Sequence, residues 1–74
     1  MWKATKVYVL SNGELVAIGD LVKVTVGEEN QVIKVTDISE IHIAGEVIVD
    51  GESSGISFSE YFTNISNAFV VKWF

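Results

Sequence analysis

Apolar and polar positions alternate along much of this chain, in stretches short enough to be single strands. In residues 41–49, every second position from Ile41 onward is apolar or glycine. Residues 21–26 repeat the pattern, with Val22, Val24 and Val26 on one face. A period of two is typical of β-strands with one buried face. The pattern therefore predicts half-buried strands, and a chain this short leaves no room for the crossover helices that parallel strands need.

Turn-forming residues separate the predicted strands. Asn12-Gly13 is a strong hairpin signal, and 27–30 and 50–52 are further turns. Val, Ile and Thr together make up 24 of the 74 residues, and β-branched side chains favour strands over helices. We expect strands over residues 3–10, 15–18, 22–26, 31–38, 41–49 and 69–74, with a loop at 53–55.

One segment has helical spacing instead. Its apolar residues stand at i, i+3, i+4 and i+7, namely Phe58, Tyr61, Phe62 and Ile65. Ser57, followed three residues later by Glu60, fits a capping box. The pattern predicts a short helix over 58–66, whose aromatic stripe faces the core or, alternatively, serves as a platform on which a ligand stacks.

Gly19-Asp20 interrupts an otherwise apolar run from Glu14 to Val26. Glycine inside a strand pattern marks a bulge or a sharp bend. We expect residues 15–18 to pair back onto the first strand, and Gly19-Asp20 to turn the chain toward the next strand. The Asp20 carboxylate would accept hydrogen bonds from nearby backbone N–H groups, so its expected role is structural.

The stretch Asn12-Gly13-Glu14-Leu15-Val16, followed by Gly19-Asp20-Leu21-Val22-Lys23-Val24, carries a family resemblance. It resembles the beginning of small SH3-like barrels, in particular the short YopX-type proteins of phages and prophages, and KOW-type barrels have a similar Gly-Asp start. The acidic residues 27–30 depart from the basic, Gly-rich continuation of KOW segments. The resemblance implies an SH3-like barrel of phage or prophage origin, and the departure argues against a ribosomal or RNA-binding role.

These observations lead to one predicted fold. We expect residues 1–74 to form a single, mostly β domain, a five-stranded antiparallel SH3-like barrel with one short helix before the last strand. An OB-fold has the same number of strands, but its helix usually lies between the third and fourth. An open sheet packed by one helix is the remaining alternative.

Composition excludes several classes of protein. Ten acidic residues against five lysines give a net charge of −5, and arginine is absent, which disfavours nucleic-acid binding. Cysteine is absent too, which excludes disulfides and thiolate chemistry. No apolar run reaches the roughly 18 residues of a membrane helix. Residues 1–6 lack the apolar region of a secretory signal, so we expect a cytoplasmic protein.

Candidate catalytic chemistry is sparse. His42 is the single histidine, and it could act as a base only if a nucleophile and an orienting group came from elsewhere in the fold. The carboxylates lack the spacing of a calcium loop, and the six glycines are too dispersed for a phosphate loop. We therefore expect no enzyme activity, no cofactor and no metal site.

Apolar residues are more numerous than a core this small can bury. They make up 49% of the chain and occupy both faces of the first and last strands. The first and last strands are neighbours in many SH3-like barrels, so their aromatic residues would form one candidate interface: Trp2, Tyr8, Trp73 and Phe74. Alternatively, the two tryptophans only cap the core.

Two functions follow from this surplus of apolar residues. The first is a non-catalytic protein-binding module that self-associates as a homo-oligomer or binds a host protein. The alternative is a barrel that binds a small ligand or nucleic acid on an aromatic stacking surface.

Overall fold

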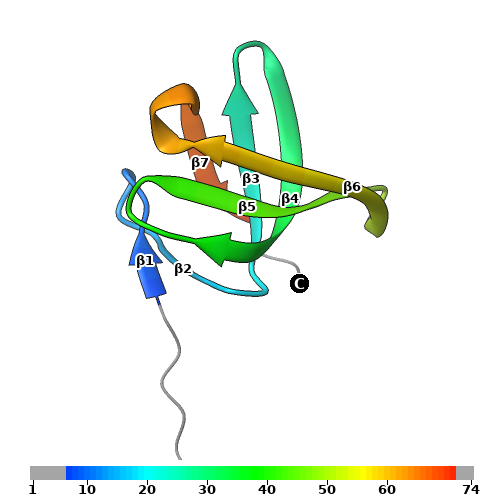
Figure 1. The fold of residues 1–74 in the computed structure, drawn as a ribbon, viewed down its shortest axis with the longest axis horizontal. Coiled ribbons are helices and arrows are strands. Elements are labelled where there is room, and N and C mark those ends of the chain that lie inside the picture. The colour runs from blue at the N-terminus through cyan, green and yellow to red at the C-terminus, as the bar shows by residue number, and fades with distance from the viewer. Residues whose placement is uncertain (1–6, 72–74) are drawn as a thin grey trace, which may run out of the picture.

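The computed structural model describes residues 7–71, and almost all of its regular structure is strand. All strand pairs are antiparallel. They form a two-stranded sheet, β1-β2, and a five-stranded sheet in the order β6-β5-β4-β3-β7 (Figure 1). The elements are β1 (Val7–Val9), β2 (Leu15–Ala17), β3 (Leu21–Val26), β4 (Glu29–Ile38), β5 (His42–Val49), β6 (Glu52–Tyr61), the 3-10 helix η1 (Phe62–Asn64) and β7 (Asn67–Val70).

The expected hairpin at Asn12-Gly13 is present, and it joins β1 to β2. The Gly13 N–H donates to the Leu10 carbonyl at 2.9 Å, and the Leu10 N–H donates to the Glu14 carbonyl at 2.8 Å. Gly13 has φ +89°, a backbone conformation that residues with a Cβ rarely adopt. A turn closed by a positive-φ glycine is the usual form of a three-residue hairpin loop.

Two of the other three hairpins have two-residue loops, and these loops are of different types. Between β3 and β4, Gly27 has φ +62° and Glu28 does not have a positive φ, which fits a type II′ turn. Between β5 and β6, Asp50 and Gly51 both have positive φ, at +53° and +81°, which fits a type I′ turn. Both turn types match the twist of the strands that they connect, so the meander β3-β4-β5-β6 has tight connections.

A β-bulge in β4 changes which side chains face the core. The pairing with β5 shifts between Val35 and Asp37, so the strand gains one residue at Thr36. Strict alternation would place Ile38 on the face opposite Ile33 and Val35. The extra residue reverses the alternation, and Ile38 is buried at 4% exposure.

The predicted helix over 58–66 is wrong. Residues up to Tyr61 belong to β6 and pair with β5, and only Phe62–Asn64 form a single 3-10 turn before the last strand. The loop expected at 53–55 is also part of β6, where three residues bulge outward opposite Val47. The segment forms a strand because it pairs with β5 along its length and so forms inter-strand main-chain hydrogen bonds. A helix this short would be only marginally stable by itself.

The core lies between the two sheets. Its buried residues are Leu10, which follows β1, and residues of β2, β3, β4, β5 and β7: Val16, Val22, Val24, Ile33, Val35, Ile38, Ile43 and Ala68. Phe58, Phe62 and Ile65 pack against this core from outside, whereas Tyr61 is 56% exposed. The aromatic stripe of the predicted helix is therefore divided between the core and the surface.

The expected barrel is not closed in residues 7–71. β6 and β7 are the two edges of the five-stranded sheet, and they do not pair with each other. The last strand pairs with β3 and not with β1, although side chains of the β1-β2 hairpin also bond to it. In this part of the chain no helix has the length and apolar character needed to cross a membrane.

Candidate functional site

Gly19 and Asp20 lie where the chain passes from the two-stranded sheet to the five-stranded one. Asp20 Oδ2 accepts a hydrogen bond from the Ala17 N–H at 2.9 Å. The Gly19 N–H donates to the Val35 carbonyl at 2.8 Å, and the Val35 N–H donates to the Asp20 carbonyl at 2.9 Å. Gly19 has φ +96°. Carboxylate and backbone thus bind this turn to both β2 and β4.

The tip of the β1-β2 hairpin is held against β7 by side chains. The Val70 N–H donates to Glu14 Oε1 at 2.9 Å, and Asn12 Nδ2 donates to the Ala68 carbonyl at 3.3 Å. Asn12 Nδ2 also donates to Glu14 Oε1 at 2.7 Å. These bonds occupy backbone groups on the edge of β7 that β3 does not use, and they fix β1 in front of the five-stranded sheet.

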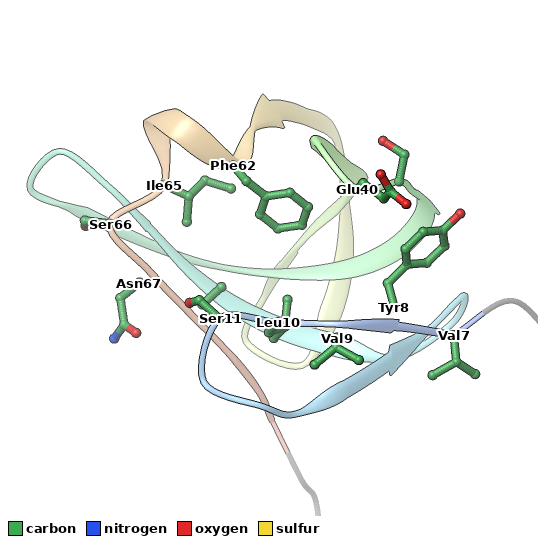
Figure 2. A pocket seen from close by; sticks show the side chains of 12 residues that line it. Val7, Tyr8, Val9, Leu10, Ser11, Glu40, Phe62, Ile65, Ser66 and Asn67 are labelled. Atoms are coloured by element: carbon green, nitrogen blue, oxygen red, sulfur yellow. The ribbon is translucent and has the colours of Figure 1, made fainter.

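A slot with both apolar and polar lining opens between β1 and the segment that contains η1. We call it the Tyr8 slot, and its volume is about 640 Å³. Tyr8 and Leu10 form one wall, and Phe62 and Ile65 point toward them from the other (Figure 2). Leu10 is only 4% exposed, and the other three side chains are partly buried against the core. The walls are therefore held in place by the packing of the domain itself.

Polar groups line the two ends of the Tyr8 slot. Ser11, Ser66 and Asn67 lie at one end, and Glu40 lies at the other, on the side of Tyr8 (Figure 2). Ser39 also lines the slot. Apolar and aromatic walls combined with polar groups that can fix the orientation of a ligand are found in binding sites for small molecules and for side chains of a partner.

Acidic residues outnumber basic residues two to one. The chain has ten carboxylates and five lysines, which gives a net charge of −5. Lys23 and Lys34, the lysines among the described residues, lie on β3 and β4, and neither lines the Tyr8 slot. Lys23 Nζ lies 5.9 Å from the centre of the Phe69 ring. The slot therefore has a carboxylate at its margin and no described cation in its lining.

A nucleophile does lie beside His42. Pairing of β5 with β6 places Ser59 Oγ 2.6 Å from His42 Nε2, and the Tyr61 ring packs edge-on against the imidazole at 5.5 Å between centroids. No carboxylate among residues 7–71 bonds to this imidazole. Ser59 is exposed and lies outside the Tyr8 slot. The pair lacks the orienting group that a serine hydrolase site uses.

Of the four residues expected at an interface, the structure describes Tyr8, which lines the slot. Trp2, Trp73 and Phe74 lie outside the described residues. Sequence reasoning did not predict that Leu10, Phe62 and Ile65 would meet Tyr8, because it assigned the last two to a helix. Among residues 7–71, no group of three or more His, Cys, Asp or Glu side chains is arranged to hold a metal ion.

Comparison with known proteins found no matching family model, no matching curated protein and no matching solved structure.

Proposed function

We propose that this chain is a non-catalytic protein-binding module that takes apolar side chains of an extended protein segment into the Tyr8 slot. The segment belongs to another protein or to a second copy of the chain. Support comes from the slot itself, because aromatic and aliphatic walls that are already packed need little ordering when a partner binds.

The proposal includes an SH3-like arrangement of the strands. A meander of four strands, a 3-10 turn and a final strand that returns to pair with the first strand of the meander is the order expected for such a fold. The phage or prophage origin implied by the Gly19-Asp20 resemblance belongs to the same proposal. The SH3-like arrangement and the phage or prophage origin are both consistent with a small domain that acts by binding.

The test is a selection of short peptides from a random display library against the whole chain, followed by NMR titration of the recovered peptides. The titrations should shift the amide signals of residues 8–11 and 62–68. Tyr8→Ser should weaken binding about tenfold, because it removes a central aromatic contact. Tyr61→Ser is the matched control, since Tyr61 is an exposed tyrosine outside the slot, and it should change affinity less than about twofold.

Two results would contradict the proposal. One is recovery of no binding peptide, combined with a solution mass of one chain at millimolar concentration. The other is a set of peptides whose shifts map elsewhere and whose affinity is the same for Tyr8→Ser as for the unmodified chain. Circular dichroism of each variant checks that the fold is retained.

A small apolar ligand is the second candidate occupant of the Tyr8 slot. The volume of about 640 Å³ lies within the range of small-molecule sites, roughly 300–1,000 Å³. The nucleic-acid form of this alternative has less support, because Phe58 and Phe62 turn toward the core and leave Tyr61 as the exposed ring of the former stripe. Titration with oligonucleotides at low salt tests it, and no change in tryptophan fluorescence would exclude it.

A further inference from the structure

We infer that the segment bound in the Tyr8 slot carries an arginine, whose guanidinium lies between the Tyr8 ring and the Glu40 carboxylate. The inference rests on the proposed function, because it assumes that the slot is where a protein segment binds. This chain contains no arginine, so the segment belongs to another protein. The inference specifies which side chain of the bound segment lies at the end of the slot that contains Glu40.

The position of Glu40 is the first observation. Its side chain lines the slot at one end, on the side of Tyr8 (Figure 2). Glu40 is exposed, and its carboxylate takes part in none of the hydrogen bonds found among residues 7–71. A cation can therefore reach this carboxylate without displacing another partner and with little loss of hydration.

The distribution of charge is the second observation. The chain holds ten carboxylates and five lysines, and the two lysines among the described residues, Lys23 and Lys34, lie outside the slot lining. An excess of one sign of charge around a cleft raises the local concentration of oppositely charged groups. The open end of the slot is thus complementary to a basic side chain and repels an acidic one.

The aromatic ring distinguishes arginine from lysine. A guanidinium is planar, so it can stack on the face of a tyrosine while two of its N–H groups donate to the two oxygens of one carboxylate. Its methylene groups can pack along the apolar wall that Tyr8 and Leu10 form. An ammonium group offers a compact charge and makes neither the stacked nor the paired contact.

The test uses the synthetic peptide acetyl-Ser-Ile-Arg-Ile-Ser-amide and three relatives in which the arginine is replaced by citrulline, lysine or glutamate. Citrulline keeps the shape of arginine without its charge. The affinity of the whole chain for each peptide is measured by NMR titration at low salt. We expect the arginine peptide to shift residues 8–11 and 62–68, and to bind about fivefold more tightly than the citrulline peptide.

Glu40→Gln should weaken the arginine peptide about fivefold and leave the citrulline peptide unchanged. Glu52→Gln is the matched control, because Glu52 is an exposed carboxylate outside the slot, and it should leave the affinity for the arginine peptide unchanged. Equal binding of the arginine and lysine peptides would overturn the assignment to arginine.

The outcomes separate this inference from the proposed function. If the arginine and citrulline peptides bind equally and both are lost in Tyr8→Ser, the slot binds protein segments but the arginine is wrong. If none of the four peptides shifts the slot residues, and the display selection also recovers nothing, both the inference and the proposed function are wrong.

Discussion

Gly45 is the residue whose replacement should most directly test how β4 and β5 pack. It lies opposite Val35 on β4 and Phe58 on β6. A Cβ built on Gly45 would overlap the Lys34 carbonyl oxygen, and it would lie 3.0 Å from the Lys34 carbonyl carbon and 3.3 Å from the Val35 Cα. These are backbone atoms, so no side chain can rotate away to make room. Gly45→Ala should therefore push the two strands apart.

The size of the effect follows from these distances. Carbon atoms in contact lie about 3.5–4.0 Å apart, so β4 and β5 must separate by roughly half an ångström or more. Overpacking of this kind costs about 1–3 kcal/mol. Alanine also restricts the unfolded chain, which offsets about 0.4–1 kcal/mol of that cost. Because the overlap is with backbone atoms, we take the upper end of the overpacking range. We then expect the free energy of unfolding to fall by about 2 kcal/mol, and the midpoint of thermal unfolding to fall by about 8–16 °C.

Urea unfolding followed by circular dichroism measures the change. Gly51 provides the control, because nothing lies within 4 Å of a Cβ built there and only its φ of +81° disfavours alanine. Gly51→Asn should be milder than Gly51→Ala, since asparagine tolerates positive φ, whereas Gly45→Asn should be worse than Gly45→Ala. Gly45→Ala within 0.5 kcal/mol of the unmodified chain, a margin typical of neutral surface changes, would refute the steric reasoning.

Three further predictions concern the bulge, the turn and the surface dyad. Ile38→Ala should lower the free energy of unfolding by about 2–4 kcal/mol in urea titrations, and a change below 1 kcal/mol would mean that the bulge does not bury Ile38. Asp20→Ala should cost about 1 kcal/mol by the same measurement, because the Ala17 N–H loses its carboxylate partner. Ser59 should not react with a fluorophosphonate probe, and labelling that disappears in both Ser59→Ala and His42→Ala would contradict the non-catalytic proposal.

Turns were the most predictable part of this fold, because their chemistry is local. Asn12-Gly13 marks the first hairpin, and Gly51 follows an aspartate that also takes positive φ. A residue without Cβ reaches positive φ at little cost, so glycine reports the backbone whatever surrounds it. Alternation likewise identified Val22 and Val24 as buried, and their exposures are 0% and 1%.

The helix was mispredicted because the spacing of its apolar residues suits two structures at once. Phe58 and Phe62 are four apart, so they share one side of a helix and also one face of a strand. Glu60 was expected to form a capping box with Ser57. Instead, its Oε1 accepts from the Tyr61 N–H at 3.2 Å and from Asn64 Nδ2 at 2.9 Å. Which structure forms depends on the edge that β5 presents, and this cannot be deduced from the segment alone.

Bulges also limit how well the alternation of apolar residues predicts which side chains are buried. One inserted residue in β4 exchanges the two faces of the strand after Val35. Ile38 is therefore buried in the core, although strict alternation would place it on the opposite face. In β6, Ser54 Oγ donates to the Val47 carbonyl at 2.7 Å and accepts from the Ile56 N–H at 3.1 Å. These side-chain bonds stabilise a bulge where the composition suggested a loop.

The Tyr8 slot depends on contacts between distant parts of the chain, which explains why the sequence did not bring Tyr8 together with Phe62 and Ile65. Its walls come from β1 and from the segment around η1, more than fifty residues apart. The bonds of Asn12 and Glu14 to β7 hold β1 at the distance that leaves the slot open. Leu10 is part of the core while it also lines the slot, so closing the slot would require repacking the core. A site whose walls are fixed in this way binds without a large entropic cost, and selectivity then rests on the few polar groups at its ends.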